Sequence, residues 1–195
     1  MLKIGITGGI GSGKTTVCRL FGAFGIPVYD ADSRAKQLMV TDADLIREIV
    51  ALFGPAAYHT DGSLHRQYIA QRVFERPEEL ARLNAIVHPA VLRDGEAWHR
   101  RQHNVPYTVK EAALLFESGS AAAMDVVITV FAPRQLRIAR VRARDGVDEA
   151  SVRARMNKQM EEGRKLELAN YVICNDQKSP LIRQVFDIHH QLLRT

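Results

Sequence analysis

The chain has 195 residues, enough for one domain with a sizeable core or for one core with an inserted subdomain. Hydrophobic residues make up 46% of it and charged residues 25%, as in ordinary soluble globular proteins, and no apolar run approaches the roughly 18 residues of a membrane span. The net charge of +5 suits a polyanionic ligand. Because no apolar run is long enough, we expect no membrane partner. Because the basic residues are spread out without an aromatic-basic stripe, we expect no nucleic-acid partner.

The chain opens with a strand pattern followed by a glycine-rich loop. Residues 2–7 form an apolar, partly β-branched run, and residues 8–15, GGIGSGKT, match the pattern G-x-x-x-x-G-K-[ST] without a mismatch. An amphipathic helix pattern follows. Glycines let successive backbone N–H groups curl round a phosphate, and the start of the helix adds partial positive charge. Strand, loop and helix together predict a P-loop that binds a nucleoside triphosphate.

Further strand patterns recur along the chain, with helical patterns between them. The five strand patterns lie at residues 2–7, 26–29, 106–110, 125–131 and 171–174. This alternation predicts a doubly wound α/β fold of the P-loop NTPase type, with a parallel five-stranded sheet covered by helices on both faces. Residues 181–193 predict a C-terminal amphipathic helix packed on the sheet.

The long stretch at 33–104 is helical in pattern almost throughout, with breaks at Gly54-Pro55 and Asp61-Gly62. Such a stretch between two strands of one sheet predicts an insertion, placed where kinases hold the acceptor substrate. Pro89 disfavours helical geometry at His88, so we expect a new helix to begin there.

The expected organisation is therefore a single kinase domain over residues 1–195. Within it we expect a nucleotide-binding core at 1–32 and 105–195, a helical substrate-binding insertion at 33–104 and a helical lid at 134–160.

GTPases, remodelling ATPases and small-molecule kinases all carry P-loops. A GTPase needs N-K-x-D, whereas the nearest string, residues 157–160, ends in Met, and D-x-x-G does not occur. A remodelling ATPase needs an apolar strand ending in Asp-Glu, whereas residues 125–131 run into Ala-Pro. Only the strand at 26–29 delivers carboxylates from its end, at Asp30 and Asp32, and in a doubly wound sheet that end lies beside the P-loop. A kinase acting on a small hydroxyl fits best.

Several independent motifs give the chain a resemblance to the dephospho-CoA kinase family over nearly its whole length. Besides residues 4–15, they are Asp30-Ala31-Asp32, residues 61–66, Val73-Phe74, residues 83–89, Leu114-Leu115-Phe116-Glu117, Arg140, Arg144-Asp145, Gln159 and residues 172–176. Other small-molecule kinases share the P-loop but lack the D-A-D, H-P and L-L-F-E motifs. A kinase for a nucleoside or a shikimate-like alcohol, and a nucleotide-dependent switch without enzyme activity, are the alternatives.

Three positions depart from that family's pattern. His65 stands where Asp or Asn is usual, Asn170 replaces a frequent Asp, and Glu111-Ala112-Ala113 precedes Leu114 where many members place a Pro. None of these removes a group expected to take part in the chemistry, although the third could reshape the acceptor pocket.

The resemblance implies transfer of the γ-phosphoryl group of ATP to the ribose 3′-hydroxyl of dephospho-CoA, which gives CoA and ADP in the last step of coenzyme A biosynthesis. Lys14 would bridge the β- and γ-phosphates, and Thr15 would bind Mg²⁺ together with waters and phosphate oxygens. The expected ATP-binding residues are Gly9, Ile10, Gly11, Ser12, Gly13, Lys14, Thr15, Thr16, Arg140, Arg144 and Asn175.

Asp32, the second Asp of the family's motif, is expected to orient and deprotonate the 3′-hydroxyl. Asp30 is then expected to cap a helix over residues 33–40. The alternative is that both are helix caps or solvated turn residues.

Arginines crowd the expected lid, and most of them should lie on solvated helix faces. Arg140 and Arg144 lie four apart beside Gly146, a candidate hinge, and Arg140 is expected to stabilise the transferring phosphate. Arg155 and Gln159, four apart on the following helix, are candidates for closing the lid.

The remaining site residues keep two interpretations each. Asn175 would read adenine through its side chain or its backbone. Arg66 would contact a substrate phosphate or form a surface ion pair, and His88 would contact the pyrophosphate or cap a helix. Glu117 would contact the substrate or the Mg²⁺ waters, or cap a helix.

Cys18 and Cys174 lack metal or redox spacing and are expected to be reduced, buried thiols. Because the P-loop begins within the first ten residues, no signal peptide is expected, and the expected location is the cytoplasm. The expected partner is the small molecule dephospho-CoA, and the expected state is a monomer or a weak homo-oligomer.

Overall fold

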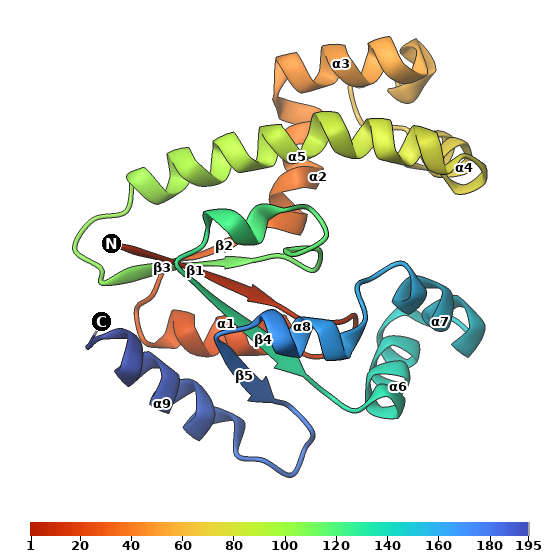
Figure 1. Ribbon diagram of the computed structural model, residues 1–195. Coiled ribbons are helices and arrows are strands. Elements are labelled where there is room, and N and C mark those ends of the chain that lie inside the picture. The colour runs from red at the N-terminus through yellow and green to blue at the C-terminus, as the bar shows by residue number, and fades with distance from the viewer. Residues whose placement is uncertain (195) are drawn as a thin grey trace. The chain divides into compact units, whose positions relative to one another are not determined.

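The computed structural model describes residues 1–194 and gives only the backbone of Phe74 and Glu75, so the motif Val73-Phe74 and the end of the chain are described in part (Figure 1). The chain divides into two compact units. The sheet unit comprises residues 1–30 and the chain from residue 99 onward, and the helical unit comprises Ala31–Trp98.

Five strands form the sheet of the sheet unit: β1 (Leu2–Thr7), β2 (Val28–Asp30), β3 (Tyr107–Glu111), β4 (Val126–Phe131) and β5 (Tyr171–Cys174). Their order is β2-β3-β1-β4-β5, and every neighbouring pair is parallel. The expected parallel five-stranded sheet is confirmed, with strand ends shifted by at most two residues. Because the connections on the two sides of β1 run in opposite directions, the carboxyl end of β1 is the switch point where ligands of such sheets bind.

One face of the sheet packs against α1 (Lys14–Ala23) and α9 (Leu181–Leu192). Their shared core consists of alternate strand residues, of one stripe from each helix and of Ile26 in the loop before β2: Ile4, Ile6, Val17, Cys18, Phe21, Ile26, Tyr107, Val109, Ile128, Val130, Ile173, Val185, Ile188 and Leu192. On the other face, the Thr129 hydroxyl donates to the carbonyl of Lys165 in α8 (Glu162–Leu168), 3.3 Å away. Since successive strand residues face opposite sides, α8 covers the face opposite to α1 and α9.

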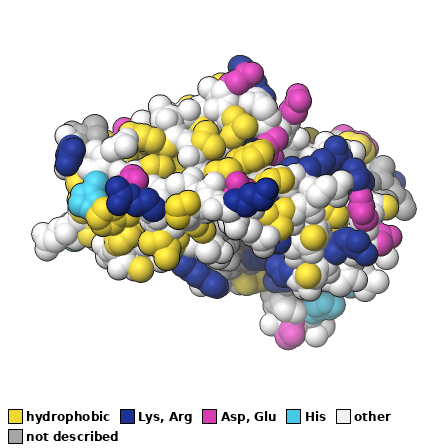
Figure 2. Space-filling model, turned by 90° about the horizontal axis from the view of Figure 1, so that it is seen from below, with side chains coloured by type: hydrophobic (Ala, Val, Ile, Leu, Met, Phe, Trp, Pro, Cys, Tyr) yellow, Lys and Arg dark blue, Asp and Glu magenta, His cyan; other side chains and the backbone are white. Residues whose placement is uncertain are grey.

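The expected C-terminal amphipathic helix is α9, although its apolar stripe is only partly covered. Val185, Ile188 and Leu192 are buried, whereas Ile182 and Phe186 are exposed. Figure 2 shows hydrophobic side chains exposed on the side of the molecule where α9 lies.

Two helices occupy most of the stretch 134–160, for which the sequence predicts a lid: α6 (Arg134–Asp145) and α7 (Glu149–Asn157). They enclose a small core of Ile138, Val141 and Val152, and the side chain of Ile10 from the P-loop packs against it. Gly146 ends α6 in the left-handed conformation (φ 67°), and its N–H donates to the carbonyl of Arg142. A residue of the P-loop therefore packs against the core of these two helices.

The helical unit contains α2 (Ala31–Thr41), α3 (Ala43–Phe53), a 3₁₀ turn η1 (Pro55–Ala57), α4 (Arg66–Glu75) and most of α5 (Pro77–Arg100). Within it, Arg34 pairs with Asp94 through two hydrogen bonds, which tie α2 to α5. The chain leaves helical geometry at both expected breaks, Gly54 and Gly62, which have φ 82°.

The expectation of a new helix at Pro89 is wrong, because α5 continues through it. A proline inside a helix removes one backbone hydrogen bond and costs about 3 kcal/mol. Val87, Ala90 and Val91 are buried on both sides of it, and their burial offsets that cost. The helix α2 also begins at Ala31, two residues before the expected start, directly after β2.

A short 3₁₀ turn, η2 (Ser120–Ala123), precedes β4. Among the helices that the structure describes, none combines the length and apolar character needed to cross a bilayer.

Candidate active site

The P-loop joins β1 to α1 at the switch point of the sheet, as expected. Gly13 caps α1 with φ 94°, and a Cβ at this position would lie 2.1 Å from Asn175 Nδ2, so only glycine fits. Lys14 Nζ donates to the carbonyl of Gly8 at 3.0 Å. Among the described residues, the buried Ser12 hydroxyl has no hydrogen-bond partner, which suits an incoming phosphate oxygen.

Glu111, at the end of β3, is a site residue that sequence reasoning missed. Thr15 Oγ1 donates to Glu111 Oε1 at 2.8 Å, and Glu111 is 7% exposed. In the sheet register, Asp30 lies opposite Glu111. The expected strand ends at residue 110, one residue before this carboxylate, so Glu111 was not counted among the carboxylates at strand ends. Applying to this strand the argument used for Asp30, that carboxylates follow strand ends, would have found it.

Cys18 lies beside the same carboxylate. Burial, together with the nearby charge of Glu111, raises the pKa of the Cys18 thiol well above its usual range. Cys18 is therefore a protonated, buried thiol, and Cys174 is also free but half-buried.

Arg140 and Asn175, two of the expected ATP-binding residues, come together at the P-loop. Arg140 Nη2 donates to the backbone oxygen of Asn175 at 3.1 Å and to its side-chain oxygen at 3.3 Å. Arg140 Nη1 lies 3.4 Å from the carbonyls of Gly11 and Ser12, and Asn175 Nδ2 donates to the latter at 2.8 Å. One guanidinium thus joins α6, the loop after β5 and the P-loop.

Arg144 is not brought to the P-loop. It forms an ion pair with Asp145, which also pairs with Arg155 at 2.8 Å. The hydrogen bond from Arg144 is the main cause that lowers the pKa of Asp145. The Arg144 side chain is 64% exposed, so it lies on the solvated face of α6.

Glu117 is engaged within the sheet unit. Its Oε1 accepts from Lys165 Nζ and from the backbone N–H of Met160, both at 2.8 Å. Burial opposes ionisation of Glu117, but these hydrogen bonds outweigh it and hold the pKa of Glu117 below its usual value. The Lys165 side chain is fully buried. Glu117 therefore ties the segment after α7, at Met160, to the loop after β3.

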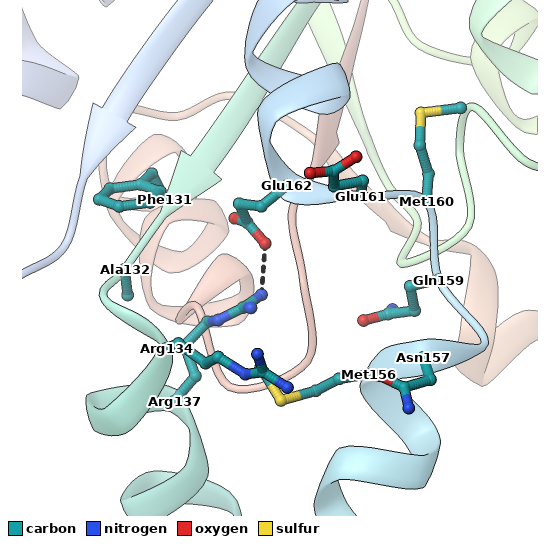
Figure 3. Close-up of a pocket in the computed structure, with 10 residues that line it drawn as sticks. All are labelled: Phe131, Ala132, Arg134, Arg137, Met156, Asn157, Gln159, Met160, Glu161 and Glu162. Atoms are coloured by element: carbon teal, nitrogen blue, oxygen red, sulfur yellow. Dashed lines mark hydrogen bonds and ion pairs between the residues drawn. The ribbon is translucent and has the colours of Figure 1, made fainter.

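A cavity of about 370 Å³ lies beside the P-loop (Figure 3). It is lined by residues of β4, α6, the end of α7 and the segment leading into α8: Phe131, Ala132, Arg134, Arg137, Met156, Asn157, Gln159, Met160, Glu161 and Glu162. Arg137 and Glu162 point toward one another and pair at 2.5 Å. A Cβ on Gly9 would lie 1.6 Å from Arg137 Nη1, so this ion pair lies directly against the P-loop.

The remaining predicted residues belong to the helical unit. Asp32 is exposed in the first turn of α2, two residues beyond the end of β2. Arg66 is the first residue of α4 and is exposed. His88 lies in the interior of α5, so the expected helix start at His88 is wrong, and the potential of a helix N-terminus does not act there.

Comparison with known proteins identifies the family. A sequence profile described as dephospho-CoA kinase matches residues 2–180. The chain belongs to the dephospho-CoA kinase family. It is 47% identical to a dephospho-CoA kinase of Salinibacter ruber over 178 residues, which cover 90% of this chain and 89% of that protein.

Solved structures share the fold of this chain. The crystal structure of TT1252 from Thermus thermophilus is similar, with a TM-score of 0.87, 35% identity and coverage of 98% of this chain and 97% of that one. A dephospho-CoA kinase from Campylobacter jejuni is 21% identical with a TM-score of 0.70, again over 98% and 97% of the two chains, which shows a shared fold. Membership in the dephospho-CoA kinase family makes this chain an ATP-dependent kinase with the P-loop fold.

The loop that carries Asn175 provides a first prediction. Asp176 accepts hydrogen bonds from the backbone N–H groups of Ser179 at 2.7 Å and Lys178 at 2.9 Å, and these lower the pKa of Asp176 to about 2. Since its pKa is lower in the folded state, the stability that Asp176 contributes is fully present above its unfolded pKa, about 3.9, and is lost as the pH falls toward 2. A carboxyl titration followed by NMR should place its midpoint near 2.

In the variant Asp176→Asn, this part of the acid dependence of stability should be absent. A midpoint near 4 in the native protein would contradict the assignment.

Proposed function

We propose that this chain transfers the γ-phosphoryl group of ATP to the ribose 3′-hydroxyl of dephospho-CoA, which yields CoA and ADP. The observation that carries the proposal is the convergence on one P-loop of Lys14, the Thr15–Glu111 hydrogen bond and the Arg140–Asn175 pair, in a chain of the dephospho-CoA kinase family. Phosphoryl transfer needs positioning and charge neutralisation more than covalent chemistry, and these groups supply both.

In this proposal the phosphates of ATP lie along the P-loop. Backbone N–H groups of residues 9–16, apart from that of Ile10, which donates to Gln159, bind them together with the Ser12 hydroxyl. Lys14 moves from the Gly8 carbonyl to the β- and γ-phosphates. The side of the loop formed by Asn175 is the place for adenine. Asn175 Nδ2 is already bonded to the Ser12 carbonyl, and the Asn175 backbone is bonded to Arg140 and Phe131, so its side chain or its backbone exchanges a partner to read the base.

The residues around Thr15 fit a Mg²⁺ ion. Mg²⁺ in such sites takes a hydroxyl, one or two carboxylates, waters and substrate phosphates. Thr15 and Glu111 offer a hydroxyl and a buried carboxylate that already contact one another, with Asp30 paired opposite Glu111 in the register. The bound ion would neutralise charge on the phosphates.

We assign the acceptor to the helical unit, because Asp32, Arg66 and His88 all belong to it. Asp32 would accept the proton of the 3′-hydroxyl as that oxygen attacks the γ-phosphorus. Arg66, exposed at the start of α4, would contact a phosphate of the substrate, and His88 the pyrophosphate. Glu117 is assigned to anchoring the lid, since Lys165 and Met160 occupy its carboxylate.

Arg140 is assigned to the transferring phosphate. Replacing Arg140 with Ala should lower kcat by roughly 10²–10³, because a positive charge aimed at the transition state is lost. Steady-state kinetics against both substrates measure this effect. Arg144→Ala is the matched control, since that arginine is 64% exposed, and its kcat should stay within about threefold of the wild type. An increase in KM alone for Arg140→Ala would assign Arg140 to ground-state binding.

The test of the function is a coupled assay of ADP release with Mg-ATP, with and without dephospho-CoA, in which the product is identified by mass. ADP formed only with the acceptor, together with CoA, supports the proposal. ATP binding without such turnover would overturn it and would point to another alcohol or to a nucleotide switch.

We further propose that the enzyme acts in the cytoplasm, in keeping with two cysteines that are both free.

A further inference from the structure

Gln159 contacts the P-loop directly. It follows α7 and lines the cavity beside the loop, opposite the Arg137–Glu162 pair (Figure 3). Its side-chain Oε1 accepts a hydrogen bond from the backbone N–H of Ile10 at 2.8 Å. Ile10 is the third residue of the GGIGSGKT loop, so a neutral side chain of the lid bonds to the segment that binds phosphates.

The chemistry of this hydrogen bond fixes the orientation of the amide. The Ile10 N–H can only donate a hydrogen bond, so the Gln159 side-chain atom that bonds to it is the amide oxygen. The amide nitrogen is the other arm of the same planar group, so its two N–H bonds are directed away from Ile10. The bond to Ile10 therefore turns Gln159 into a hydrogen-bond donor of fixed orientation beside the P-loop.

The backbone around Gln159 is also fixed by hydrogen bonds. Its N–H donates to the Met156 carbonyl, and the next N–H, that of Met160, donates to Glu117, which is paired with the buried Lys165. On the other side of the contact, the Ile10 side chain packs against the core of the lid. A donor held in this way needs no reorganisation during the reaction, which is the condition under which a donor lowers a barrier most.

We propose that Gln159 is a catalytic residue that donates a hydrogen bond from Nε2 to the γ-phosphoryl group during its transfer, while its Oε1 stays on the Ile10 N–H. This inference rests on the nucleotide site proposed above. The carboxamide carries no charge, so it is a donor to the phosphoryl oxygens that adds to the positive charges of Lys14 and Arg140 without repelling them.

Two substitutions separate the two ends of the amide. Gln159→Glu keeps an oxygen for the Ile10 N–H but replaces the donor with a carboxylate oxygen that repels phosphate. Gln159→Met has a similar length and removes both ends. Gln135→Glu makes the same change of charge at an exposed position of α6 and is the matched control.

The measurements are kcat with dephospho-CoA, the affinity for ADP and the thermal midpoint. Removing one donor to a transition state costs about 10²–10³ in kcat. We expect kcat of Gln159→Glu to be at least a hundredfold lower than that of the wild type. The decrease in Gln159→Glu should be at least as large as the decrease in Gln159→Met. The affinity for ADP, which lacks the γ-phosphate, should stay within about threefold of the wild type, and Gln135→Glu should retain the wild-type kcat.

A kcat near the wild-type value in Gln159→Glu, with a loss only in Gln159→Met, would show that Gln159 only fastens the lid to the loop and would overturn the proposal. Should Gln159→Glu fail to fold, a wild-type kcat in Gln159→Met would overturn it equally, and a hundredfold loss with unchanged ADP affinity would support it. The wild-type rate on dephospho-CoA, and its loss in Lys14→Ala, test the proposed function separately.

Discussion

Replacing Asp32 with Asn is expected to lower turnover of dephospho-CoA at least a hundredfold while leaving the affinity for ATP unchanged. A general base contributes ~10²–10⁴ to the rate, and asparagine keeps the size and polarity of the side chain but cannot take the proton. The residue is exposed in the first turn of α2, so the substitution removes no buried contact. Steady-state ADP release and the binding of a fluorescent ATP analogue measure the two quantities.

The chain offers a matched control for this variant. Both α2 and α3 begin with Ala-Asp, so Asp44 occupies the same helical position as Asp32. Asp44→Asn reproduces the loss of a negative charge at a helix N-terminus, worth about 0.3–1 kcal/mol of stability, and should leave kcat unchanged. Near-normal turnover in Asp32→Asn, or an equal loss in Asp44→Asn, would refute the assignment of Asp32 as the base.

The largest effect on stability is expected from Glu117→Gln, at about 3 kcal/mol of unfolding free energy. The Lys165 side chain is fully buried and that of Glu117 is 20% exposed, so the substitution leaves a buried ammonium without its counter-charge. Urea unfolding followed by circular dichroism measures the loss as a shift of the midpoint.

Glu167→Gln, on the helix α8 that also carries Lys165, is the control. The side chains of Arg164 and Glu167 are both more than half exposed, so their ion pair contributes about 0–1 kcal/mol. Adding Lys165→Met to Glu117→Gln removes both charges and should restore most of the loss. Equal stability of Glu117→Gln and Glu167→Gln would contradict a role of the buried pair.

The same pair makes the protein sensitive to acid in a definite direction. The pKa of Glu117 is lower in the folded state than in the unfolded state. Its stabilising contribution is therefore complete above the unfolded value, about 4.3, and declines as the pH falls through the lower folded value. The Glu117→Gln variant should lack this decline.

The parts of the fold that are determined by residues close to one another in the sequence were predicted well. The P-loop between β1 and α1 follows from eight consecutive residues, and the strands follow from short apolar runs. Glu111 was missed because β3 extends one residue beyond its apolar run and the buried carboxylate ends it. The continuous helix through Pro89 was also missed, because local preference stops a helix there and only the buried residues on both sides sustain it.

Contacts between segments that lie far apart in the chain could not be predicted from the sequence pattern. Lys165 lies in a stretch rich in charged residues, which is typical of an exposed helix, and nothing in the sequence around it indicates that its side chain is buried. Its partner Glu117 lies after β3, and the two meet because α8 packs on β4. The hydrogen bond between Gln159 and Ile10 likewise requires the lid to return to the first loop of the chain.

The central position of β1 also governs the order in which the chain can fold. Its two neighbours, β3 and β4, begin at Tyr107 and Val126, so β1 can pair only after these later segments have been made. Contacts between distant segments form slowly because the intervening chain must first be ordered, whereas those within the helical unit span shorter separations. A nascent chain therefore carries the complete phosphate-binding motif before it has the two neighbouring strands that hold β1 in the sheet.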